Sequence, residues 1–205
     1  MSKVTIIDYG MGNLGSIQNM FKRIGVESEI TGDHEKIVVA EKILLPGVGA
    51  FDAAMERINQ NGLRELLNKK ALDEKVPTLG ICLGMQLLTN SSEEGTLPGL
   101  GWIPAKTVKF VFEPGSKLKV PHMGWNLVKP KHASPLIADL PEETRFYFVH
   151  SYYVKADDEN NVLTTTTHGL EFHSIIQKDN IFGAQFHPEK SHKYGMKLLE
   201  NFARI

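Results

Sequence analysis

The chain has 205 residues, of which 41% are hydrophobic, and its 23 basic and 24 acidic side chains give a formal net charge of −1. This balance argues against broad electrostatic attraction to nucleic acid or to an anionic membrane. The single cysteine, Cys82, excludes an intramolecular disulfide and any zinc site that needs two or more cysteines.

We expect one domain over residues 1–205, because this length is typical of a single compact core. No apolar run approaches the roughly 18–20 residues of a membrane span, and residues 1–4 show no signal-peptide pattern. The sequence therefore predicts a soluble, cytoplasmic protein.

Strand and helix patterns alternate from residue 4 to residue 89. Short apolar runs predict strands at residues 4–7, 26–30, 43–45 and 78–81. Apolar residues at helical spacing predict helices from residue 14 to a stop at Gly25 and over residues 51–58, 63–72 and 83–89, followed by a polar segment at residues 90–92. This alternation is typical of a parallel sheet covered by helices on both faces.

The next part of the chain lacks strong helical patterns. Strand-like runs between turn residues predict antiparallel hairpins at residues 107–112, 127–128, 146–149, 152–155, 162–167 and 172–177. Residues 181–186 predict another buried strand, and a last helix begins near Ser191. The predicted fold class is therefore α/β, with a mainly parallel central sheet, helices on both faces and an antiparallel strand-rich segment.

The strongest local motif is GICLG at residues 80–84, which stands between a predicted strand and a predicted helix. It is the cysteine version of the nucleophile elbow, in which flanking glycines permit a tight, strained turn. The N-terminus of the helix favours a thiolate at Cys82, and the N–H of Leu83 is suited to binding an oxyanion. A buried cysteine that acts only as a small hydrophobe is the alternative, which the glycines and the strand–helix context disfavour.

A nucleophilic thiol needs a base, and His187 in the segment FHPE follows a predicted apolar strand. Open parallel sheets place their sites at this end of their strands. Glu189 lies two residues on, on the same side of an extended segment, and is suited to orienting the imidazole. The sequence thus predicts Cys82 as nucleophile, His187 as base and Glu189 as orienting carboxylate.

Residues 47–49, Gly-Val-Gly, follow the predicted strand at residues 43–45. Glycines at this place are suited to presenting the N–H groups of Val48 and Gly49 to an oxyanion, although Pro-Gly alone is more typical of a turn.

A competing motif, GMGNLG at residues 10–15, has the G-x-G-x-x-G form of a dinucleotide-binding loop between a strand and a helix. Glu29 and Asp33 lie close to where an acid for the ribose would be sought. Asp8, however, would place a carboxylate beside the pyrophosphate, and this interpretation gives Cys82 and His187 no role. A tight strand–helix turn is the favoured interpretation.

Together these residues resemble the class I (triad) glutamine amidotransferases. Four segments are similar to the glutaminase subunits of imidazole glycerol phosphate synthase within that family: DYGMGNL at residues 8–14, PHMGWN at 121–126, FVHSY at 148–152 and HPEKS at 187–191. The resemblance implies hydrolysis of glutamine through a thioester at Cys82, no metal and no organic cofactor. It also implies ammonia transfer to a cyclase, which this short chain leaves to a separate subunit.

The resemblance further implies roles for residues that the pattern alone does not single out. Contacts to glutamine are implied for Gly49, Gln86, His150, Ser151 and Tyr152. We expect the cyclase to dock around the mouth of the site, at Asn13, Met123, Trp125, Asn126 and Lys190.

Two alternatives to the glutaminase remain at this point. The first is another cysteine hydrolase of similar fold, such as a γ-glutamyl hydrolase or a peptidase. The second is a nucleotide-binding module that uses residues 10–15.

Overall fold

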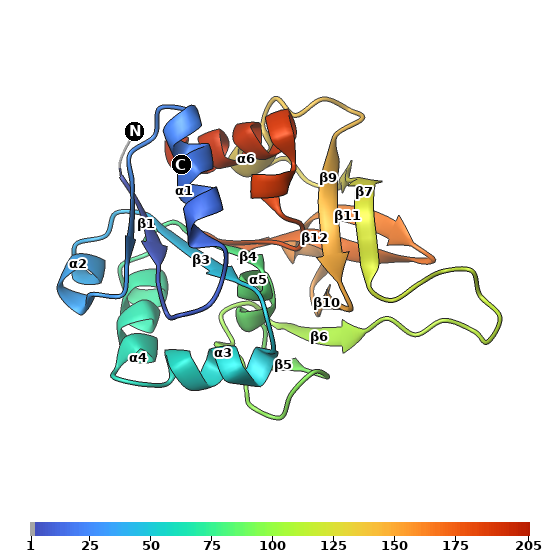
Figure 1. Cartoon of the computed structure of the whole chain (residues 1–205), viewed down its shortest axis with the longest axis horizontal. Helices are drawn as coiled ribbons and strands as arrows, with labels where there is room; N and C mark the ends of the chain where they lie inside the picture. Colours follow the sequence, from blue (N-terminus) through green and yellow to red (C-terminus); the bar gives the residue numbers. More distant parts are fainter. Residues whose placement is uncertain (1–2) are drawn as a thin grey trace.

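The computed structural model describes residues 3–205, which form a mixed eleven-stranded sheet with helices on both of its faces (Figure 1). Its parallel part has the strand order β2-β1-β3-β4-β13. These strands are β1 (Val4–Ile7), β2 (Ser28–Thr31), β3 (Ile43–Gly47), β4 (Thr78–Cys82) and β13 (Ile181–Ala184).

The sheet continues beyond β13 through antiparallel pairs, in the order β12-β10-β6, and β5 closes this edge parallel to β6. A side branch adds β11 beside β12 and β8 beside β11. The bounds are β5 (Ser91–Ser92), β6 (Ala105–Lys109), β8 (Lys129–Pro130), β10 (Tyr152–Ala156), β11 (Val162–His168) and β12 (Leu170–Lys178). A separate two-stranded sheet pairs β7 (His122–Leu127) with β9 (Arg145–His150).

Two helical layers cover the parallel strands. Helices α1 (Leu14–Arg23) and α6 (His192–Arg204) lie on one face, and α3 (Phe51–Ile58), α4 (Leu63–Asn68) and α5 (Leu83–Leu87) lie on the other (Figure 1). A short α2 (His34–Val38) follows β2. Neighbouring residues of β1 show the two faces: Ile6 packs with the α1 and α6 layer, and Ile7 with the opposite layer.

The predicted sheet, its two helical layers and its antiparallel segment are confirmed. Several element bounds differ from the prediction. Strand β2 begins at Ser28 rather than at residue 26, because the N–H of Val26 bonds the Phe21 carbonyl at the end of α1. The helix predicted over residues 63–72 ends as α4 at Asn68 and continues as a π-helical turn, Lys69–Asp73. In this turn the buried Lys70 ammonium donates to the Val38 carbonyl at 2.8 Å and to the Glu74 carboxylate at 2.6 Å.

Several further elements were not predicted as such. Helix α2 begins after Asp33, whose carboxylate accepts the N–H of Glu35 at 2.9 Å as an N-cap. The polar segment after α5 contributes β5 to the sheet. Strand β7 spans six residues, although only residues 127–128 were expected to be extended. The polar His122 and Asn126 and the intervening Gly124 leave no continuous apolar run in this segment.

Residues 1 and 2, which bear on the expectation of no signal peptide, lie outside the described residues. Within residues 3–205, no helix combines the length and the apolar character that crossing a bilayer requires.

The substitution Phe202→Ala should destabilise the fold, because Phe202 is fully buried on α6 and packs edge-on against Phe182 of β13. Removing such a ring costs about 3–5 kcal/mol. Urea unfolding measures this loss. Arg204→Ala on the same helix is the control, since Arg204 is exposed and its ion pair with Glu200 contributes roughly 0.5 kcal/mol or less. Equal stability of the two variants would contradict this packing.

Candidate active site

Cys82 lies at the junction of β4 and α5 with φ +54° and ψ −110°, which is a strained backbone for a residue with a side chain. Gly84 makes this turn possible. A Cβ placed on Gly84 would lie 1.9 Å from the Leu45 carbonyl oxygen, so only glycine permits α5 to start this close to β3. The predicted elbow is therefore present, with Cys82 facing a cavity and the N–H of Leu83 at the start of the helix.

His187 reaches the same point from the neighbouring strand. Its Nδ1 donates to the Glu189 carboxylate at 2.8 Å, and the ring lines the same cavity as Cys82. Ser191 fixes the turn, because its hydroxyl donates to the His187 carbonyl at 2.6 Å and accepts the N–H of Tyr147 at 3.0 Å. The three side chains predicted from two separate segments are thus brought together.

The charge on His187 follows from these contacts. Burial lowers the pKa of His187, but the hydrogen bonds to Cys82 and Glu189 and the negative charges of these partners outweigh burial and raise it to about 9. At neutral pH the ring is therefore an imidazolium, held between the side chains of Cys82 and Glu189.

The cavity over Cys82 has a volume of about 370 Å³, a size suited to a small molecule. It brings together Cys82 and His187 with all the residues expected at glutamine and at the oxyanion, which are Val48, Gly49, Leu83, Gln86, His150, Ser151 and Tyr152. Sequence reasoning missed Glu94, Pro121 and Val149, which also line it. The Glu94 carboxylate accepts the N–H of Phe51 at 3.0 Å and gives the cavity wall an acidic group that complements an ammonium ion.

The loop with Val48 and Gly49 forms one edge of the cavity. Gly49 has φ +116°, and a Cβ there would lie 2.7 Å from the Met11 methyl carbon, so this loop packs directly on the loop that precedes α1. Both loops lie at the carboxyl ends of parallel strands, where such sheets place their sites.

Gln86 and Gln185 form a buried amide pair below the cavity. The Gln86 amide donates to the Tyr152 carbonyl and to the Gln185 side-chain oxygen, both at 3.2 Å. The Gln185 amide in turn lies 3.9 Å from the Cys82 sulfur. Gln185 had not been singled out; its polar side chain within the apolar run of residues 181–186 was the available signal.

The residues expected at a partner surface differ in exposure. Met123 is 62% and Trp125 45% exposed, and Asn13 and Lys190 are also exposed. The Trp125 indole stacks on His192 at 5.5 Å between ring centroids, which fixes its direction. Asn126 is different: its amide is bonded entirely within the chain, to His122, the Thr167 carbonyl and the Leu127 N–H.

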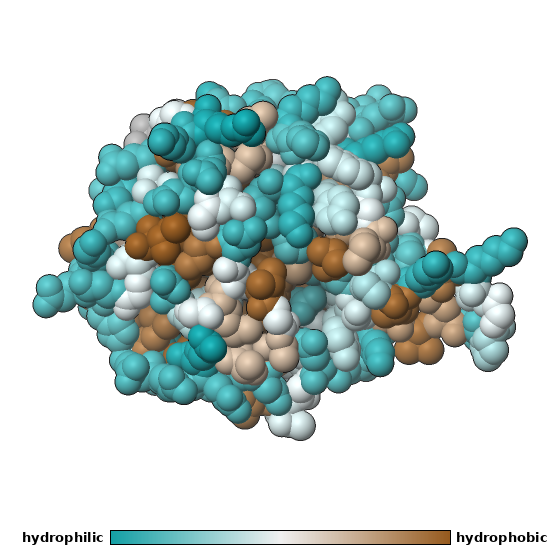
Figure 2. Space-filling model, in the orientation of Figure 1, coloured by the Kyte–Doolittle hydropathy of each residue, from teal (hydrophilic) through white to brown (hydrophobic). Residues whose placement is uncertain are grey.

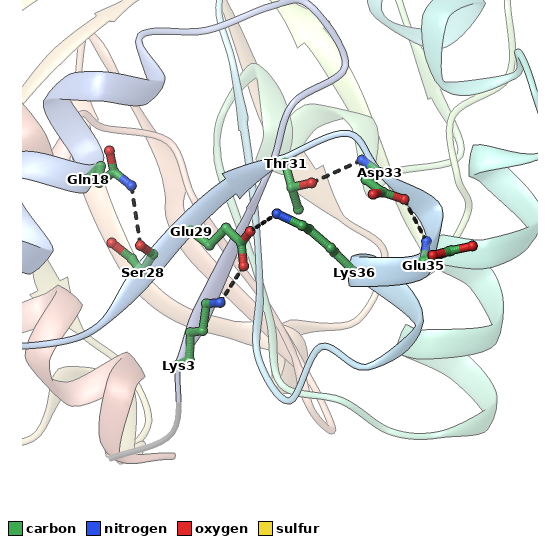
Figure 3. A network of polar contacts seen from close by, with 8 residues as sticks. All are labelled: Lys3, Gln18, Ser28, Glu29, Thr31, Asp33, Glu35 and Lys36. Atoms are coloured by element: carbon green, nitrogen blue, oxygen red, sulfur yellow. Dashed lines mark hydrogen bonds and ion pairs between the residues drawn. The ribbon is translucent and has the colours of Figure 1, made fainter.

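Residues 10–15 form the tight strand–helix turn that was favoured over a dinucleotide loop. Arg57 covers the turn by donating to the Gly10 carbonyl at 2.8 Å. Figure 3 shows that Glu29 is held between Lys3 and Lys36, while Asp33 caps α2. Both acids considered for a ribose are therefore engaged in structural contacts.

Comparisons with known proteins agree with this geometry. The model of the family "Glutamine amidotransferase class-I" matches residues 5–205. The chain is 59% identical to imidazole glycerol phosphate synthase subunit HisH 2 of Methanococcus maripaludis, with 98% of each chain covered, and 46% identical to HisH 2 of Pseudomonas aeruginosa, with 98% of this chain and 99% of that one covered.

Solved structures show the same fold. A glutamine amidotransferase structure superimposes with a TM-score of 0.74 at 16% identity, covering 98% of this chain and 99% of that one. The structure of PurLQS from Thermotoga maritima gives a TM-score of 0.72 at 16% identity over 98% of this chain and 97% of the other.

The protonation of His187 should depend on its two partners. We expect its imidazolium to persist to about pH 9 in the unmodified chain, and Cys82→Ala and Glu189→Gln each to lower that pKa. Because the folded pKa lies above the unfolded value of about 6.5, this contribution to stability is complete below pH 6.5 and is lost as the pH rises to 9. NMR titration of the ring measures the pKa. An unchanged value in both variants would contradict the contacts described.

Proposed function

Since the chain belongs to the class I glutamine amidotransferase family, and within it to the HisH subunits of imidazole glycerol phosphate synthase, we propose that it hydrolyses glutamine for that enzyme of histidine biosynthesis. The observation that carries the proposal is the Cys82–His187–Glu189 arrangement at the wall of the cavity. The HisH relatives favour this function over a γ-glutamyl hydrolase or a peptidase. We propose that residues 1–205 act as a single glutamine amidotransferase domain.

The mechanism begins with attack of the Cys82 sulfur on the side-chain amide carbon of glutamine. A C–S bond forms and the carbonyl π pair moves to oxygen, where the N–H groups of Leu83 and of the Val48–Gly49 loop are proposed to bind it. His187 then protonates the amide nitrogen, the C–N bond breaks and ammonia leaves a thioester. The raised pKa of His187 supports this step, because the required proton is already on the ring at neutral pH.

Hydrolysis of the thioester completes the cycle. His187 removes a proton from water, whose oxygen attacks the thioester carbon, and the C–S bond breaks to release glutamate and the Cys82 thiolate. Glu189 holds the ring orientation throughout through its bond to Nδ1. Glutamine itself is proposed to lie against Gly49, Gln86, His150, Ser151 and Tyr152, with its ammonium group near Glu94.

Ammonia released into water would be diluted and protonated, which supports transfer to a docked acceptor. We propose that a separate cyclase subunit docks around the cavity mouth on Asn13, Met123, Trp125 and Lys190. The arm between β6 and β7, at the right of Figures 1 and 2, extends this surface with exposed apolar side chains. These are Val111, Leu118 and Val120. Exposed apolar patches beside a site are typical of protein interfaces.

The substitution Cys82→Ala should abolish glutamate release in the complex with cyclase and leave ammonia-dependent cyclisation intact. The nucleophile is removed, but little core volume is lost. A coupled glutamate assay and a cyclisation assay with added ammonium salt measure the two activities. Glutamate release at a comparable rate would refute the role of Cys82, and loss of both activities would indicate failed assembly instead.

The substitution Trp125→Ala should weaken assembly with the cyclase by about 2 kcal/mol or more, the cost typical of truncating an interface tryptophan. Its half-exposed position predicts little loss of thermal stability in the isolated chain. Titration calorimetry measures assembly. Val39→Ala is the control, because Val39 is 74% exposed on the segment after α2, outside the proposed surface. If both variants bind the cyclase with equal affinity, Trp125 is not part of the interface.

A further inference from the structure

Two buried histidines face each other across the small β7–β9 sheet. His122 of β7 pairs directly with His150 of β9, and the distance from His122 Nδ1 to His150 Nε2 is 3.0 Å. Both residues lie on the inner face of their strands and are almost fully buried. His150 lines the cavity over Cys82, but His122 does not, so the catalytic steps above give His122 no role.

The cavity end of this pair fixes one proton. His150 Nδ1 lies 2.7 Å from the Tyr152 carbonyl oxygen, which can only accept, so Nδ1 carries the hydrogen. In a neutral ring His150 Nε2 is then an acceptor, and the hydrogen between the two rings belongs to His122 Nδ1.

The contact between Asn126 and His122, at the other end of the pair, independently indicates the same direction of hydrogen-bond donation. The Asn126 side-chain nitrogen donates to the Thr167 carbonyl at 2.9 Å, and its oxygen accepts the Leu127 N–H at 2.8 Å, so the amide has one possible orientation. Its nitrogen therefore donates to His122 Nε2 at 3.1 Å, which must accept. Only one arrangement satisfies every group: Asn126 donates to His122, His122 to His150, and His150 to Tyr152.

The surroundings keep both rings neutral. The titratable neighbours of His122 are His150 and His168, which stacks on it at 4.2 Å between centroids; His150 has His122, His168 and His187 nearby. Burial and the neighbouring histidine His168 lower the pKa of His122 to about 4, and burial is also the main cause that lowers the pKa of His150 to about 3. The other ring contacts of His122 are with Phe110, Phe148 and Phe172.

We propose that His122, supported by Asn126, is a positioning residue for glutamine binding: it fixes the tautomer and the ring direction of His150, and with them the Tyr152 carbonyl at the cavity wall. This inference rests on the proposed glutaminase function. It assigns the partly buried Asn126 amide to contacts within the chain, whereas Met123 and Trp125 alternate with His122 and Asn126 and are exposed on the same strand.

The tautomers can be measured in the isolated chain. Long-range ¹H–¹⁵N NMR between pH 6 and 8 should show both His122 and His150 neutral, each with its hydrogen on Nδ1. A hydrogen on Nε2 of His122, or a charged ring in this range, would overturn the proposal whether or not the chain hydrolyses glutamine.

The substitution Asn126→Asp reverses the direction of the hydrogen bond between residue 126 and His122. A carboxylate accepts from His122 Nε2, which moves the hydrogen there and leaves two acceptors facing each other between His122 and His150. At lower pH His122 takes up a second proton and again donates to His150. In the complex with cyclase, we expect KM for glutamine to rise about tenfold at pH 8.5, with kcat changed less, and to return towards the unmodified value at pH 6.

Matched variants separate positioning from folding. Asn160→Asp, an equal charge change at an exposed residue, should leave KM and its pH dependence unchanged. His122→Phe keeps a ring in the aromatic cluster but removes the donor, and should raise KM at every pH without rescue by acid. If Asn126→Asp has the unmodified KM at pH 8.5, or if acid does not restore it, the positioning role is wrong. No glutamate release from the unmodified complex would instead refute the proposed function.

Discussion

The close approach of helix α5 to strand β3 is the constraint on which the site depends. With no side chain at Gly84, the helix starts against the Leu45 carbonyl and the backbone at Cys82 is driven to a positive φ. The strands on either side of β4 then supply the other components. Gly47 of β3 pairs with Cys82 and leads into the Val48–Gly49 loop, while β13 pairs with β4 on the opposite side and leads to His187. The strand order β3-β4-β13 therefore brings three segments that are distant in the sequence together around the Cys82 sulfur.

Three histidines near the cavity show how partners decide charge under similar burial. His187 is buried against a carboxylate and a thiol, and the pKa of its ring is raised. His150 and His122 are buried against each other, a carbonyl and an amide, and the pKa of each is lowered. None of the groups bonded to this pair carries a charge, so burial dominates there. The protonated His187 ring supplies the proton for catalysis, whereas the neutral rings of His150 and His122 donate their hydrogen bonds in one fixed direction.

Much of this could be predicted from the sequence, because the relevant signals are local. The GICLG motif encodes the elbow through its glycines, and the apolar runs of β1, β3, β4 and β13 identify the buried parallel strands. The two-residue spacing of His187 and Glu189 is also local. Strand β7 was largely missed, because half of its residues face outward and the inner ones include a histidine and an asparagine. Gln185 and Glu94 were missed since their roles depend on contacts between segments that are distant in the sequence.

Strand β7 carries two sets of residues on one backbone. His122 is buried and the partly buried Asn126 bonds to it, so the polar atoms of this set are matched within the chain, whereas Met123 and Trp125 face outward. Because the period of a strand is two residues, point substitutions can change either set without touching the other. A single-residue insertion or deletion would exchange the faces, burying Met123 or Trp125 in place of the hydrogen-bonded groups. The length of this segment should therefore vary far less over evolution than the identity of its outward residues.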